Sequence, residues 1–140
     1  GEERELAAQI DRLLASPRSF DAARRFYDDW LDLRRLDVLE RNTQRFPSFQ
    51  RALLADMKAE TQALFETVWQ GKLPLPRLFD LSETKASRAL ATHYGLPSPK
   101  DGVTRYDLAS VAERGGLLTH GSLHTIGGDQ SSTVIRGLFA

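Results

Sequence analysis

The chain has 140 residues, of which 41% are hydrophobic, and its 19 basic and 19 acidic side chains give a formal net charge of +0. This length is enough to bury a true core, and the balanced charge argues against a nucleic-acid-binding protein, which normally has a surplus of Lys and Arg. No run approaches the roughly 18 apolar residues of a membrane span, and the lack of cysteine excludes disulfides, thiolate metal sites and covalent haem attachment within this sequence.

The first predicted helix covers residues 2–15. Acidic residues fill its first turn, where they suit the helix dipole. Its large apolar side chains recur at helical spacing and are Leu6, Ile10, Leu13 and Leu14. Pro17 disfavours a helical conformation at Ser16, so we expect the helix to end there.

A second helix is predicted from a cap at Ser19 to Leu33 or Leu36. It has a broad aromatic face that includes Trp30, and we expect this tryptophan and Trp69 to lie in the core. The acidic residues of this helix are Asp28, Asp29 and Asp32. We interpret them as part of a solvated charged face rather than as a carboxylate site, because arginines stand at helix-neighbour spacing from them.

The longest predicted helix runs from an N-cap at Ser48 to a stop at Gly71. At roughly 1.5 Å per residue it would span about 30 Å, the width of a small domain. Its apolar stripe includes Leu53, Met57, Leu64 and Val68. We expect this stripe to pack against the aromatic face of the preceding helix.

A fourth helix is predicted from a cap at Ser82 to Tyr94, because Gly95 and a proline follow it closely. The turn-rich segment that follows is the best candidate for a domain boundary. It would divide the chain into a helical domain at residues 1–98 and a second unit at residues 99–140.

The second unit begins with a short predicted strand at Val103–Leu108, which needs a partner strand, and continues with a predicted helix at Leu117–Ile126. We expect that partner in the tail or in the rest of a longer protein. The sequence therefore predicts an all-α fold in the main: a four-helix amphipathic bundle-like domain, followed by a short helical or irregular tail with at most one strand.

Three motifs occur together: RFYDDWLDL at residues 25–33, ALATHYGL at 89–96 and RGGLLTHGS at 114–122. In combination they resemble two adjacent domains of unknown function, DUF1592 and DUF1588, in large bacterial proteins of planctomycetes and myxobacteria. The resemblance implies that residues from about 16 to 97 correspond to most of the first domain and residues from about 103 to 140 to the truncated start of the second. It also implies an exported parent protein, periplasmic or extracellular, which carries cytochrome c-type haem modules elsewhere in its polypeptide.

His120 and His124 form the sharpest local feature of the sequence. On a helix they would lie one turn apart on one face, where two imidazoles reach one metal or haem iron, with Asp129 as a third ligand. The pattern lacks the glutamate that a zinc protease uses as its general base. We therefore favour two histidines packed at a helix surface, and a ligand role is the alternative.

The last stretch of the chain offers one other candidate site. Ser131 and Ser132 precede Arg136, which we expect to order the adjoining loop or to bind an anion. Neither serine has the context of a nucleophile elbow, and the glycine pairs lack the lysine of a phosphate loop. These residues give no prediction of hydrolase activity.

Two functions remain from the sequence. The favoured one is a non-catalytic structural or interaction module of a larger exported, cytochrome c-associated protein, with no cofactor in this chain and haem c in the parent protein. The alternative is part of a haem- or metal-dependent oxidoreductase with His120 or His124 near its active centre. The expected partners are other domains of the parent, including cytochrome c modules, or a second copy of the chain; nucleic acid and membrane are not expected.

Overall fold

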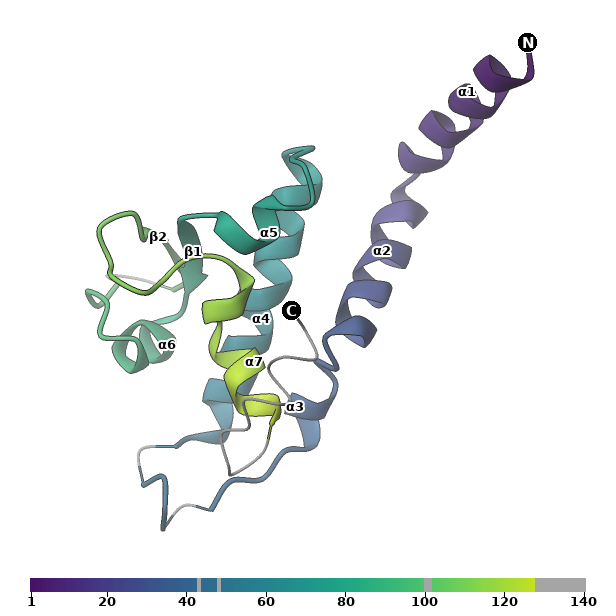
Figure 1. Ribbon diagram of the computed structural model, residues 1–140. Helices are drawn as coiled ribbons and strands as arrows, with labels where there is room; N and C mark the ends of the chain where they lie inside the picture. Colours follow the sequence, from purple (N-terminus) through teal and green to yellow (C-terminus); the bar gives the residue numbers. More distant parts are fainter. Residues whose placement is uncertain (43, 48, 100–101, 128–140) are drawn as a thin grey trace.

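The chain is mostly helical and is built around one long helix, with a small two-stranded sheet at one side (Figure 1). The computed structural model describes residues 1–42, 44–47, 49–99 and 102–127. The helices are α1 (Glu2–Leu14), α2 (Pro17–Trp30), α3 (Arg35–Val38), α4 (Arg51–Gln70), α5 (Arg77–Asp80), α6 (Arg88–His93) and α7 (Gly121–Ile126), with a 3₁₀ turn, η1, at Leu117–Thr119. The strands are β1 (Glu83–Ala86) and β2 (Thr104–Asp107).

The predicted helix at residues 2–15 is confirmed as α1 and ends near Ser16 as expected, but α2 begins earlier than predicted and ends at Trp30 rather than at Leu33 or Leu36. Ser16, not Ser19, caps α2, because its hydroxyl oxygen accepts a hydrogen bond from the Arg18 backbone nitrogen and Pro17 fits the first helical position. The Ser19 hydroxyl instead donates to backbone carbonyls at the end of α1 and the start of α2. The corner between the two helices is therefore held by local hydrogen bonds.

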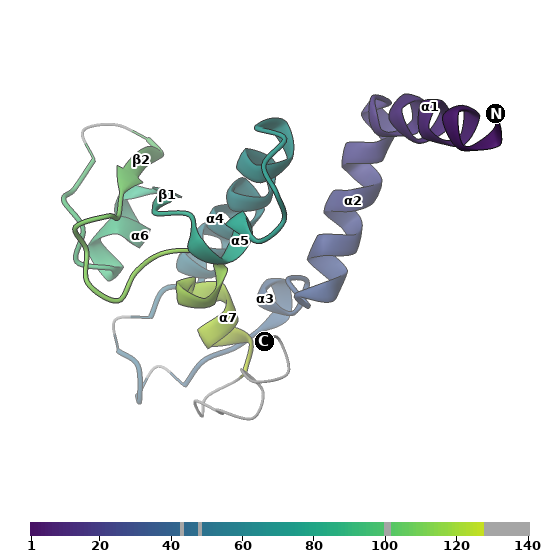
Figure 2. The same cartoon turned by 45° about the horizontal axis from the view of Figure 1, so that its top comes forward.

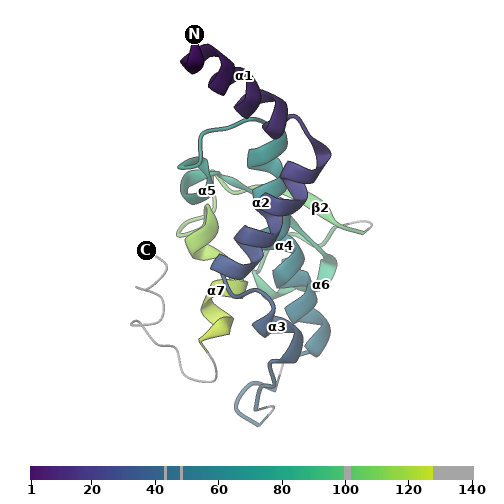
Figure 3. The same ribbon diagram turned by 90° about the vertical axis from the view of Figure 1, so that its right-hand side faces the viewer.

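α1 projects away from the rest of the molecule, as the views in Figures 2 and 3 agree. None of its residues is buried, and its large apolar side chains are all exposed. The apolar spacing predicted a helix correctly. It did not predict that this helix would leave its apolar stripe uncovered.

The central helix α4 begins at Arg51 with Gln50 as its N-cap residue, and the predicted cap Ser48 lies outside the described residues. Its predicted apolar stripe is buried, as expected, but it faces two core clusters rather than one. Leu64 and Val68 belong to the cluster that contains residues of α2. Leu53 and Met57 instead join the cluster beneath the sheet and α6, so half of the predicted packing against α2 is wrong.

The cluster between α2 and α4 contains Tyr27 of α2, whose ring stacks on Phe65 of α4 at 4.8 Å between centroids. Leu31, one turn later, is fully buried beside it. Trp30 meets only the edge of Tyr27, at 6.2 Å, and is 40% exposed. The expectation that Trp30 is a core residue is thus wrong, because Tyr27 and Leu31 occupy the side of α2 that meets α4.

The predicted helix from Ser82 to Tyr94 is also wrong in its first half. Glu83–Ala86 forms strand β1, with Thr84 and Ala86 turned inward, and Ser87 rather than Ser82 caps the short helix α6. The predicted strand at Val103–Leu108 is confirmed as β2, and its antiparallel partner is β1. A bundle of four helices is therefore not confirmed. The described part of the chain contains two strands, of which β2 lies in the predicted tail and β1 does not.

The predicted boundary between residues 98 and 99 remains a prediction, although β1 and β2 pair across it. The predicted helix at Leu117–Ile126 is present in two pieces, η1 and α7, which are separated by His120. Within the described residues, no helix combines the length and the apolar character needed to cross a membrane.

Candidate functional site

A cluster of polar side chains is buried where α4, β1 and the start of α7 meet. Glu60 and Thr61 are consecutive residues of α4, and Thr84 reaches them from β1. His120 and Ser122 approach from the other side and are buried as well. We call this set, together with the half-buried Tyr94, the polar cluster.

Glu60 is the carboxyl group of the polar cluster and is only 2% exposed. The hydroxyls of Thr84 and Tyr94 donate to its two carboxyl oxygens, each at 2.6 Å. Burial raises the pKa of Glu60, whereas the two hydrogen bonds and the positive charge of Arg114 act in the opposite direction. Both oxygens are therefore satisfied without contact with solvent.

His120 is the N-cap residue of α7 and is 3% exposed. Its Nδ1 lies 3.0 Å from Oγ1 of Thr61, and its Nε2 lies 4.0 Å from Oε1 of Glu60. Burial, with a smaller contribution from Arg114, lowers the pKa of His120 to about 4. The imidazole is thus neutral at pH 7, so its approach to Glu60 is not an ion pair at that pH.

Thr61 links the two sides of the polar cluster. Its Oγ1 lies 2.6 Å from Oγ of Ser122, and it donates a hydrogen bond to the backbone carbonyl of Met57. Ser122 is fully buried. A nucleophile must reach its substrate, so the burial of Ser122 favours a structural role for this hydroxyl.

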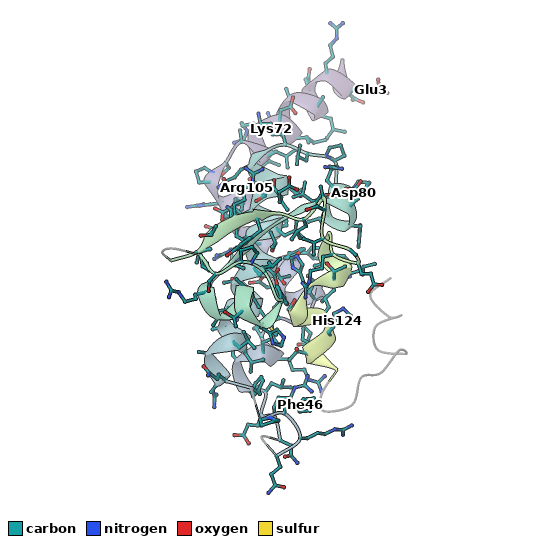
Figure 4. All side chains as sticks on the ribbon, turned by 90° about the vertical axis from the view of Figure 1, so that its left-hand side faces the viewer. Glu3, Phe46, Lys72, Asp80, Arg105 and His124 are labelled. Carbon is teal, nitrogen blue, oxygen red and sulfur yellow. The ribbon has the colours of Figure 1, made fainter. Side chains whose placement is uncertain are left out.

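The two histidines that the sequence singled out do not converge. His120 is buried in the core and contacts Thr61. His124 is instead exposed on α7 (Figure 4), and its Nε2 lies 3.1 Å from the backbone oxygen of Leu118. They do not share a face because His120 stands just before α7 rather than within it. Asp129, Ser131, Ser132 and Arg136 lie outside the described residues.

Metal ligation finds no further support from this geometry. Among the residues that the structure describes, no group of three or more His, Cys, Asp or Glu side chains is placed to hold a metal ion. The nearest carboxylate to His120 is Glu60, which already accepts two hydrogen bonds. The two rings do not converge within the described residues, and a ligand role that includes Asp129 stays a prediction, because Asp129 lies outside those residues.

Sequence reasoning missed Glu60, Thr61, Thr84 and the link that Tyr94 makes to them. The signal for the first two was present, because Glu60 and Thr61 stand three and four residues from Met57 and Leu64 on the buried stripe of α4. A charged residue at such a position must find partners inside the protein. Tyr94 was interpreted only as the end of a helix.

Comparison with known proteins gives a family and no described activity. Neither the curated proteins nor the solved structures include a match to this chain. A family model described as "PSD4: Protein of unknown function (DUF1592)" matches residues 1–96, which include α1 to α6 and the Glu60, Thr61, Thr84 and Tyr94 members of the polar cluster. The chain therefore belongs to the family of proteins of unknown function DUF1592.

Proposed function

We propose that this chain is a non-catalytic structural or interaction module of a larger exported, cytochrome c-associated bacterial protein. Its partner is another domain of the same polypeptide, and its contact surface is the apolar stripe of α1. The membership in DUF1592 supports the family part of this proposal. The resemblance of residues 114–122 to DUF1588 adds the adjoining domain and a periplasmic or extracellular location.

The observation that carries the proposal is the exposure of α1. Leu6 is 62% exposed and Ile10 47% exposed, although the spacing of these side chains forms one continuous stripe. A short isolated helix is marginally stable in water, and contiguous exposed apolar surface marks an interaction site. Glu3, near the free end of α1, stands far from the core of the molecule (Figure 4). The helix is thus positioned to reach a neighbouring domain.

The polar cluster supports a non-catalytic role. Glu60, His120 and Ser122 are groups that enzymes use, but all three are buried and engaged with other side chains. They link α4 to the segment around α7 and leave no reactive atom at the surface. Haem c, which the resemblance implies for the parent protein, is held by its other modules, because this chain has no cysteine for covalent attachment.

The test compares Ile10→Glu in the isolated 140-residue chain and in the intact parent protein. In the isolated chain the thermal unfolding temperature should stay unchanged, since Ile10 is exposed. In the parent protein the same change should speed hydrogen exchange across α1, because a charge would be placed in the contact with the neighbouring domain.

Ala8→Glu is the matched control, because Ala8 is exposed on the opposite side of α1 and should have no effect in either protein. Equal exchange of α1 in the isolated chain and in the parent protein would contradict the proposed contact. A stable dimer of the isolated chain that Ile10→Glu dissociates would show that a second copy, not a neighbouring domain, covers the stripe.

A further inference from the structure

We propose that a pocket beside the polar cluster binds a small organic carboxylate, with Arg114 as the group that recognises it. The pocket has a volume of about 570 Å³, within the range of small-molecule sites, and is open to solvent. It lies between the end of α6 and the loop that leads to η1 and α7, with Tyr94 and Arg114 in its wall.

Arg114 is presented in a way that suits a carboxylate. Its guanidinium carbon lies 3.5 Å from the centroid of the Tyr94 ring, so the charged group sits over the aromatic ring. Stacking leaves the edge of a guanidinium to donate, and two parallel N–H groups match the two oxygens of a carboxylate. Among the described residues, no carboxylate lies within ion-pair distance of Arg114, although it is half-buried.

The backbone around Arg114 is held in uncommon conformations. Glu113 has a φ of 63°, and Gly116 has a φ of 65°. The Gly116 nitrogen donates to the carbonyl of Leu81, and the Gly115 nitrogen donates to the hydroxyl of Thr119. These bonds fix the backbone on the C-terminal side of Arg114. A preorganised donor loses less freedom when a ligand binds.

The charge around the pocket favours a monoanion. Burial and, to a smaller extent, the positive charge of Arg114 lower the pKa of His93, which lines the pocket together with Arg114 and His124. The exposed carboxyl of Glu113 lines the same pocket and Glu60 lies behind Tyr94, so they offset part of this positive charge. A singly charged carboxylate is therefore accommodated better than a dianionic phosphate.

The rest of the wall suits a ligand with an apolar body. The side chain of Leu118 is 44% exposed and Met57 lies at the base of the pocket, so an alkyl or aryl group would cover apolar surface there. The ligand class that fits is a carboxylate with a few carbon atoms attached. Butyrate is a probe with this chemistry, acetate lacks most of the apolar body, and phosphate lacks it entirely.

The experiment is an NMR titration of the full chain at pH 7 with butyrate, acetate and inorganic phosphate, following the ring signals of His93 and His124. Butyrate should give saturable shifts at both histidines and bind more tightly than acetate or phosphate. Arg114→Gln should weaken butyrate binding about tenfold or more, since a charge-assisted pair is lost. Arg77→Gln, a change to an arginine paired with Asp80 outside the pocket, should leave binding unchanged.

Arg114→Lys provides a second variant that keeps the charge if Arg114→Gln fails to fold. It should also bind butyrate more weakly than the native chain, because an ammonium cannot form two parallel bonds to one carboxylate. Three results would overturn the proposal: no saturable shift in the native chain, phosphate binding as tight as butyrate binding, or native affinity in Arg114→Lys.

Discussion

The hydroxyl oxygen of Tyr94 lies 2.6 Å from Oε2 of Glu60 and 2.8 Å from the backbone nitrogen of Gly121. It donates to the first and accepts from the second, so one side chain joins the central helix α4, the end of α6 and the start of α7. Burial and the neighbouring Glu60 raise the pKa of Tyr94, which keeps the phenol protonated and able to donate. Residues far apart in the sequence are thus held together by a single atom.

The first prediction is that Tyr94→Phe destabilises the fold by roughly 1–3 kcal/mol, because Glu60 loses a donor and the Gly121 nitrogen loses its acceptor. Urea denaturation of both proteins measures the difference. Tyr106→Phe is the control, since the Tyr106 hydroxyl donates to a backbone oxygen at an exposed position and its loss should cost less. Equal losses of unfolding free energy in the two variants would mean that the buried Tyr94 hydrogen bonds stabilise the fold no more than the exposed Tyr106 bond does.

The second prediction concerns pH. The pKa of His120 falls from 6.5 to about 4 on folding, so the unfolded chain takes up this proton first as the pH drops. His120 therefore contributes stability that is complete above about pH 6.5 and is lost as the pH falls towards 4, by at most roughly 3 kcal/mol. Glu60, whose pKa is raised, and Arg114 are the charged groups nearby that act on the same equilibrium.

Urea denaturation at several pH values between 7 and 4 tests this prediction. His120→Gln should show a shallower loss of stability over that range than the native chain. His124→Gln changes an exposed ring and should follow the native curve. If His120→Gln loses stability as steeply as the native chain, the buried imidazole is not the titrating group.

The third prediction is that Leu64→Ala lowers the free energy of unfolding by roughly 2–5 kcal/mol, because Leu64 is buried in the cluster between α2 and α4. Leu6→Ala removes the same atoms from an exposed position on α1 and should change stability by less than about 0.5 kcal/mol. Thermal or urea unfolding of the isolated chain distinguishes the two. A large loss for Leu6→Ala would show that α1 packs on the core after all.

The fourth prediction is that Gly116→Ala is much more harmful than Gly95→Ala. Both glycines have positive φ, but a Cβ at Gly116 would lie 2.1 Å from the carbonyl oxygen of Phe79, whereas nothing lies within 4 Å of a Cβ at Gly95. We expect a loss of roughly 2–5 kcal/mol at Gly116 and about 1 kcal/mol at Gly95. Comparable unfolding midpoints would argue against the close approach of α5 to this loop.

The fifth prediction is that zinc does not bind tightly at His120 and His124, because one ring is buried against Thr61 and the other is on the surface. Calorimetric titration at neutral pH should show no binding in the sub-micromolar range. Tight binding that is abolished separately by His120→Ala and by His124→Ala would restore the shared metal site as the leading interpretation.

The sequence predicted the elements whose signals are local. The apolar spacing of Leu6 and Ile10 located α1, and the spacing of Leu53 to Val68 located α4. It misplaced the start of α2 because Ser16 and Ser19 are both plausible caps, and only the proline between them favours the first. Local patterns identify which faces are apolar, but they do not state what each face contacts.

Non-local contacts explain the remaining errors. Residues 83–86 form a strand because β2 pairs with them and because Thr84 reaches Glu60, and every one of these partners lies at least 18 residues away. The same applies to the candidate site, where the helical spacing of His120 and His124 was overridden by the hydrogen bond between His120 and Thr61. A regular pattern is informative only when the segment adopts the assumed backbone.

The pairing of β1 with β2 has a consequence for how such proteins evolve. The family match ends at residue 96, before β2, yet Leu108 and His120 complete the core and the polar cluster that the earlier residues begin. A gene rearrangement that transferred residues 1–96 alone would leave β1 without its partner strand. It would also remove His120 from beside Glu60 and expose that part of the polar cluster to solvent. The two segments are therefore expected to be inherited as a pair and to accept substitutions in concert at the positions where they meet.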